Sequence, residues 1–249
     1  RSINDPDEEW LTDNHIDEII HRIDQLPAGD LLAANEQGTA WLQNGIEVDV
    51  GEQGVPDHRP VKLIDFDQVR DGNSFVAVRQ FRVQPLVVGN AACEPDIVLF
   101  VNGIPIVVIE CKRPDQRNLL REAIKQLLRY QNMRVADDPY AEGVPELFRF
   151  CQVTVATTNN TAKYGPIGTR ASRYLGWKDT HPFTEDEAKT LLGVDERDLT
   201  PQEILAVGML NPATLLDLVQ NYVSFEESVT GTKKIVPRYV QYRAADLAV

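Results

Sequence analysis

Residues 95–112 read PDIVLFVNGIPIVVIECK, and this stretch decides the fold. Two apolar runs rich in β-branched residues flank Asn102-Gly103, a dipeptide typical of tight hairpin turns. The second run ends in Glu110, Cys111 and Lys112, so an otherwise apolar strand finishes with two charged side chains. Because side chains alternate faces along a strand, Glu110 and Lys112 project to one side of the sheet and Cys111 to the other.

The register of this hairpin decides whether a second carboxylate joins them. A strict two-residue loop pairs position 96 with position 109 and directs Asp96 to the wrong face. A three-residue loop with a bulge at Gly103, or a bulge within either strand, pairs 96 with 110 and brings the two carboxylates together. We therefore predict an irregularity in this hairpin.

Paired carboxylates at a strand end suit a hard divalent cation such as Mg²⁺, which prefers oxygen ligands and retains several waters. The backbone carbonyl of Cys111 can supply another oxygen. Lys112 can orient or deprotonate the attacking water and offset charge that develops at phosphorus. These are the parts of a metal-assisted phosphodiesterase. The alternative is that Glu110 and Lys112 only mark the point where a buried strand emerges into solvent.

A helix is predicted over residues 118–135, NLLREAIKQLLRYQNMRV, from apolar residues that recur at helical spacing. Gln126 and Tyr130 are four residues apart and lie on one side of that helix, at the border of its apolar stripe. Such a pair either contacts a ligand or caps the edge of a core.

Basic residues recur every four positions on the same helix, at Arg117, Arg121, Lys125 and Arg129, with Arg113 just before it. At 3.6 residues per turn this row forms a tilted basic ribbon that can follow a phosphate backbone. The alternative is a solvated face whose cations pair with Glu122 and other acids.

The remaining chain indicates a mixed α/β fold. A helix is expected over residues 15–26, capped by Asp13 or Asn14, and a loop over 43–60 with a short strand near Ile46 and Val48. Strands are expected over residues 61–66, 74–83 and 148–158, and helical pieces over 184–226.

Composition limits the classes of function. The 249 residues are 43% hydrophobic, which suffices for a sizeable core, and no apolar run reaches the roughly 18 residues needed to cross a bilayer. The three cysteines lack CxxC spacing, so a reducing cytoplasm is expected. A net charge of −13 argues against DNA binding through bulk electrostatics, so any DNA contact must be local.

Asp96 after Pro95, the Glu110-Cys111-Lys112 strand end, and Gln126 with Tyr130 together resemble the PD-(D/E)xK nuclease superfamily, in particular its RecB-like branch with a QxxxY element. The match is closer to the N-terminal endonuclease domain of the R (restriction, motor) subunit of type I restriction enzymes. Further segments occur in the order expected of that subunit: LIDFD at 63–67, AIKQLLRYQN at 123–132, VPELFRF at 144–150, ATTNNTAKYGPIGT at 156–169 and LLDLVQNYVSFE at 215–226.

The resemblance implies a restriction-endonuclease-like core, a mixed central β-sheet flanked by helices, with a C-terminal helical extension. We expect the endonuclease domain at residues 1–195 and a helical linker toward a helicase-like motor at 196–249. Asp96 and Glu110 would bind Mg²⁺ with the Cys111 carbonyl, and Lys112 would be the catalytic lysine.

The resemblance also implies supporting and nucleotide-binding residues. Gln126 and Tyr130 would support the site or the DNA, together with Arg113 and Arg117. In the segment KIVPRYVQYRAA at 234–245, Gln241 matches the adenine-reading glutamine of the full-length subunit. No GxxxxGK[ST] phosphate loop is present, so ATP is expected only as a cofactor of the full-length subunit.

The implied function is Mg²⁺-dependent hydrolysis of double-stranded DNA within an ATP-driven complex. The expected partners are the modification and specificity subunits and the chain's own motor domains, in the cytoplasm and without a membrane. The first alternative is a catalytically idle module of the same fold that binds DNA or docks to other subunits. A stand-alone repair or junction-resolving nuclease is the second.

Overall fold

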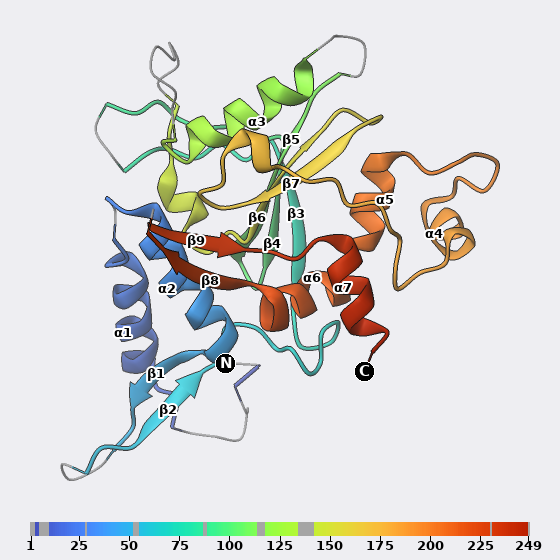
Figure 1. Cartoon of the computed structure of the whole chain (residues 1–249). Helices are drawn as coiled ribbons and strands as arrows, with labels where there is room; N and C mark the ends of the chain where they lie inside the picture. The colour runs from blue at the N-terminus through green and yellow to red at the C-terminus, as the bar shows by residue number, and fades with distance from the viewer. Residues whose placement is uncertain are drawn as a thin grey trace.

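The computed structural model describes residues 3–4, 10–27, 29–51, 55–86, 89–113, 118–133, 142–229 and 231–248. A five-stranded sheet in the order β3-β4-β5-β6-β7 forms its centre (Figure 1). Only β5 and β6 are parallel, and α3 connects them across one face of the sheet. The strands are β3 (Phe75–Arg79), β4 (Ile97–Val101), β5 (Ile104–Cys111), β6 (Val153–Thr157) and β7 (Ala162–Pro166), and the helix is α3 (Leu119–Tyr130). The predicted mixed α/β fold is confirmed.

Helical layers cover both faces of β5, which explains why its sequence is apolar almost throughout. On one face Val108 packs in a cluster with Ile124 and Leu127 of α3. On the other face Val107 and Ile109 share a cluster with residues of the C-terminal helices. The strand is therefore a central strand whose middle is buried and whose two ends, at Ile104-Pro105 and Cys111, are only partly buried.

The N-terminal part packs beside the sheet as two helices and a hairpin (Figure 1). The elements are α1 (Asp13–Asp24), α2 (Leu31–Asn44), β1 (Ile46–Asp49) and β2 (His58–Val61). The first helix was expected, but Thr12 is its N-cap residue rather than Asp13 or Asn14. Ile19 of this helix is buried, whereas Ile20 is 52% exposed.

Helix α2 was not expected, because three of its five buried residues are Asn35, Gly38 and Thr39, which give no apolar signal. The segment 61–66, expected as a strand, contributes only Val61 to β2. Beyond it, the Asp65 carboxylate accepts hydrogen bonds from the backbone N–H groups of Asp67 and Gln68 and turns the chain.

The C-terminal part begins with short helices, as expected, and then departs from the expectation. Its elements, after η1 (Pro145–Phe148) and η2 (Ala171–Arg173), are α4 (Glu185–Leu192), α5 (Pro201–Gly208), α6 (Pro212–Asp217), η3 (Leu218–Tyr222), β8 (Ser224–Ser228), β9 (Gly231–Ile235) and α7 (Tyr239–Asp246). The β8–β9 hairpin interrupts the expected helical extension, and Lys234 of β9 is buried against α2.

One hydrophobic cluster includes Tyr164, Leu205 and Tyr242, which lie on both sides of residue 195. The domain boundary at that residue stays a prediction. None of the helices in the described residues has the length and apolar character needed to cross a membrane.

Candidate active site

A bulge in β5 sets the register that the hairpin needs. Val101 pairs with Ile104, as a two-residue loop at Asn102-Gly103 requires, but Ile97 pairs with Ile109 at the other end of the strands. The pairing shifts by one residue between these points, and Ile106 is the additional residue in β5. Continuing the shifted register places position 96 opposite position 110. The predicted irregularity is confirmed, in the form of a bulge within a strand.

A hydrogen bond fixes Asp96 against the end of β5. Its Oδ2 accepts from the backbone N–H of Cys111 at 2.7 Å, and its own carbonyl accepts from Gln80 N–H at 2.9 Å. The Cys111 side chain packs with the cluster on the face away from α3, so the predicted alternation of side chains holds. Burial, and then the charges of Asp96 and Glu110, raise the pKa of the Cys111 thiol to about 11, so it remains protonated at neutral pH.

Glu110 is a buried carboxylate with an unsatisfied oxygen. Only 1% of the residue is exposed, and its Oε2 accepts a hydrogen bond from Lys112 Nζ at 3.2 Å. Its Oε1 is buried and has no hydrogen-bond partner among the described residues. Burial raises the pKa of Glu110 to about 7, and the negative charge of Asp96 adds to this effect.

A chain of hydrogen bonds joins the end of β5 to α3. Lys112 Nζ donates to Gln126 Oε1 at 2.8 Å, and Gln126 Nε2 donates to the Tyr130 hydroxyl at 2.6 Å. Burial, and then the charge of Glu110, raise the pKa of the Tyr130 hydroxyl, which therefore remains protonated. The two helix residues predicted to share a side thus meet the strand residues in one polar cluster.

The pairing of β5 with β6 holds the backbone of the lysine. Lys112 N–H donates to the carbonyl of Thr157 at 2.8 Å, in parallel register with Cys111 opposite Thr157. Thr157 Oγ1 in turn donates to Gln202 Oε1 at 3.2 Å, which ties this strand end to α5. Thr157 and Gln202 were not singled out from the sequence, since no local pattern marks a residue that acts through its backbone or from a distant helix.

Two residues of the predicted basic ribbon on α3 pair with acids. Lys125 pairs with Glu122 at 2.9 Å, and Arg129, whose side chain is 9% exposed, pairs with Glu142 at 3.1 Å. For these two residues the alternative, pairing with acids, is correct. Arg113 and Arg121 are exposed, and Arg117 lies outside the described residues.

Gln241 lies in the first turn of α7, where its Oε1 accepts a hydrogen bond from Arg238 N–H at 2.9 Å and completes a capping box. The side chain is exposed. Its expected role in reading adenine stays a prediction, since the contact seen here is a helix cap.

The donor set fits a magnesium ion better than a transition metal. Within the described residues no group of three or more His, Cys, Asp and Glu side chains surrounds a common point. The site instead offers the carboxylates of Asp96 and Glu110 and the adjacent backbone of Cys111. Mg²⁺ is commonly bound through one or two carboxylates and retains waters in its remaining positions. The unsatisfied, buried Glu110 Oε1 is the observation that favours a cation here.

The mixed five-stranded sheet, with a charged cluster where its central parallel strands end, is consistent with the core of a restriction-endonuclease-like protein. The chain belongs to the family described as the type I restriction enzyme R protein N terminus, which matches residues 2–173.

Comparison with curated proteins agrees with this assignment. The chain is 28% identical over 247 residues to the type I restriction enzyme HindI endonuclease subunit of Haemophilus influenzae, covering 96% of this chain and 21% of the relative. It is 24% identical over 247 residues to the putative MjaIXP endonuclease subunit of Methanocaldococcus jannaschii, covering 96% of this chain and 22% of the relative. It is 30% identical over 212 residues to the putative MjaVIIIP endonuclease subunit of the same organism, covering 84% of this chain and 18% of the relative. The chain thus spans about a fifth of the length of these relatives.

Proposed function

We propose that this chain is the Mg²⁺-dependent endonuclease domain of a type I restriction enzyme R subunit and hydrolyses phosphodiester bonds of double-stranded DNA. The observation that carries the proposal is the pair formed by Asp96 and the buried Glu110, with Lys112 hydrogen-bonded beside them. Membership of the R protein family supports the restriction role.

The residues have distinct tasks in this proposal. The carboxylates of Asp96 and Glu110 and the carbonyl of Cys111 would hold Mg²⁺. When bound, the ion supplies a Lewis acid that lowers the pKa of bound water and polarises phosphoryl oxygens. Lys112 carries a positive charge beside the carboxylates, so its ammonium donates a hydrogen bond toward the attacking water or an oxygen of the scissile phosphate.

Gln126 and Tyr130 are positioning residues. The Gln126 side-chain carbonyl accepts a hydrogen bond from Lys112 Nζ at 2.8 Å and so holds the ammonium group at the strand end. The Tyr130 hydroxyl accepts a hydrogen bond from Gln126 Nε2 at 2.6 Å and so determines the orientation of the amide. This ordering lowers the cost of placing a flexible lysine in one geometry.

Membership of the R protein family also supports a proposal for the wider assembly. We propose that the whole subunit acts in the cytoplasm with modification and specificity subunits, and that ATP serves its motor domains. The competing proposal, an idle DNA-binding or docking module, gives no reason to bury a carboxylate with an unsatisfied oxygen, which costs about 1–3 kcal/mol or more.

Plasmid cleavage tests the proposal. The full-length subunit, assembled with its partner subunits, is incubated with plasmid, Mg²⁺ and ATP, and wild type is compared with Asp96→Asn and Lys112→Ala. Asn at position 96 keeps an acceptor for the Cys111 N–H but removes the charge. The control is Lys178→Ala, which removes an exposed lysine elsewhere.

We expect both site variants to hydrolyse ATP at the wild-type rate and to lose about 100-fold or more of their cleavage rate, while Lys178→Ala cuts normally. Cleavage at the wild-type rate by Asp96→Asn would favour the docking module and place the nuclease elsewhere.

A further inference from the structure

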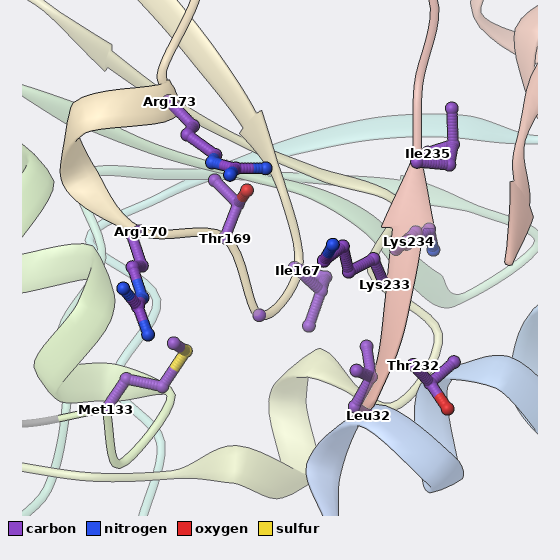
Figure 2. A pocket seen from close by; sticks show the side chains of 11 residues that line it. Leu32, Met133, Ile167, Thr169, Arg170, Arg173, Thr232, Lys233, Lys234 and Ile235 are labelled. Atoms are coloured by element: carbon purple, nitrogen blue, oxygen red, sulfur yellow. The ribbon is translucent and has the colours of Figure 1, made fainter. Parts of the chain in front are cut away.

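A basic pocket lies away from the nuclease site. It has a volume of about 500 Å³ and is enclosed by the segment that follows β7, by β9, by Leu32 at the start of α2 and by Met133 after α3 (Figure 2). Its basic lining residues are Arg170, Arg173, Lys233 and Lys234. Among the described residues no acidic side chain lines it, although the whole chain carries a net charge of −13.

The two lysines of β9 have different roles because neighbouring side chains of a strand point to opposite faces. Lys233 extends into the pocket, whereas Lys234 turns to the other side of the strand (Figure 2). Lys234 Nζ donates to Asn35 Oδ1 at 2.7 Å and to Gln152 Oε1 at 2.8 Å, so it anchors β9 to the core. The cations that face the pocket are therefore Arg170, Arg173 and Lys233.

These three cations lack an ion-pair partner among the described residues, although Glu226 of β8 is opposite Lys233 in the hairpin. Within the described residues neither Arg170, Arg173 nor Lys233 forms an ion pair or a side-chain hydrogen bond to a carboxylate. Some arginines elsewhere in the chain do form ion pairs, as in the contact of Arg197 with Glu203 and that of Arg243 with Asp179 at 2.7 Å. Three cations without an ion-pair partner among the described residues thus line one pocket, an arrangement that suits an anion.

The backbone that carries the arginines is held in place. Gly168 N–H donates to the side chain of the buried Gln131 at 3.1 Å, and Arg173 N–H donates to the carbonyl of Arg170 at 2.9 Å in the turn η2. Gly168 has φ of +77°, a conformation that favours glycine. The two arginines are thus attached to an ordered turn of the backbone.

The pocket and the nuclease site lie at opposite ends of the sheet. The site lies where β6 ends, since Cys111 is opposite Thr157. Because β7 runs antiparallel to β6, its last residue, Pro166, is opposite Val153, where β6 begins. The arginines follow Pro166 and therefore belong to the other end of the sheet.

We infer that this pocket binds phosphate groups of the DNA backbone, as a contact separate from the cleavage site. Guanidinium groups match the geometry of phosphate oxygens and bind them through paired hydrogen bonds. Thr169 adds a hydroxyl donor at the same pocket. A local basic site also explains how a chain with an acidic surface holds a polyanion. The inference rests on the proposed action on DNA.

DNA binding by the full-length protein tests the inference. Anisotropy of a fluorescein-labelled duplex is measured in EDTA, where no cleavage occurs, over a range of salt concentrations. Wild type is compared with Arg170→Ala/Arg173→Ala and with the control Arg70→Ala/Lys178→Ala, which removes two exposed cations outside the pocket. A third variant, Arg170→Lys/Arg173→Lys, keeps the charge but loses the paired hydrogen bonds, and thermal unfolding verifies that all variants fold.

We expect the pocket double variant to bind the duplex about tenfold or more weakly than the control double variant. The slope of log K against log salt should become less steep, by about 2. The lysine variant should keep the slope and bind with intermediate affinity. Equal affinity and slope in the two alanine variants would overturn the inference. The inference would also be overturned if the pocket double variant lost only the binding of dAMP and bound the duplex as well as the control does, because the pocket would then take a free nucleotide.

Because binding is measured without cleavage, the two proposals fail separately. Loss of duplex binding in the pocket variant together with normal cutting by Asp96→Asn rejects the nuclease assignment alone. Normal binding by the pocket variant together with loss of cutting by Asp96→Asn rejects the pocket alone.

Discussion

Replacing Glu110 by glutamine should change how the stability of the metal-free protein depends on pH. The folded state raises the pKa of Glu110 from 4.5 to about 7. Between these values the folded protein binds a proton that the unfolded chain has released, so the stability from this group is present below about pH 4.5 and lost as pH rises through 7. Glutamine does not titrate and removes this loss.

The expected size follows from the two pKa values. At about 1.4 kcal/mol for each pKa unit, the loss in wild type approaches about 3 kcal/mol above pH 7. Solvent screening reduces this figure little, since Glu110 is 1% exposed. The free energy of unfolding of Glu110→Gln, relative to wild type, should therefore rise by about 2–3 kcal/mol between about pH 5 and about pH 8.

Urea unfolding in EDTA at the two pH values measures this difference. Glu227→Gln, at an exposed glutamate of β8, serves as control and should differ from wild type by less than about 0.5 kcal/mol at both pH values. Replacing EDTA with Mg²⁺ at the higher pH should stabilise wild type more than Glu110→Gln, because only the native carboxylate binds the ion well. If the difference in unfolding free energy between Glu110→Gln and wild type does not change with pH, the pKa of Glu110 is not raised in the folded protein.

Two other predictions concern the packing around α2. Gly38→Ala should destabilise the protein by about 2 kcal/mol or more, because its Cβ would collide with the backbone carbonyl of Arg149, while Gly29→Ala, with no described atom within 4 Å, should fold as well as wild type in thermal unfolding. A loss in Gly38→Ala no larger than in Gly29→Ala would contradict this contact. Burial holds the pKa of Lys234 well below its usual range, so wild type should gain stability as pH rises toward about 10, where the unfolded chain alone binds the proton. Lys234→Met should lack that gain in urea unfolding at several pH values, and an equal gain in both proteins would show that Lys234 is charged when folded.

Local periodicity made much of the site predictable. Alternation along β5 places Glu110 and Lys112 on one face, and helical spacing on α3 aligns Gln126 with Tyr130. The need to bring Asp96 opposite Glu110 even predicts a bulge. These features depend on neighbours within a few residues or on a single hairpin, so the chain determines them before any distant packing forms.

Contacts between distant segments decided the rest. The burial that leaves Glu110 Oε1 without a partner requires α3 and β6 to pack around β5, and the pairing of Arg129 with Glu142 removes a cation that helical spacing alone assigns to the surface. The basic pocket joins Arg170 to Lys233, more than sixty positions further along the chain. By itself, the sequence determined which residues can do chemistry and on which face each lies. Only the tertiary structure decided which charges are buried, paired or left open, because solvation and pairing depend on neighbours that the chain brings together when it folds.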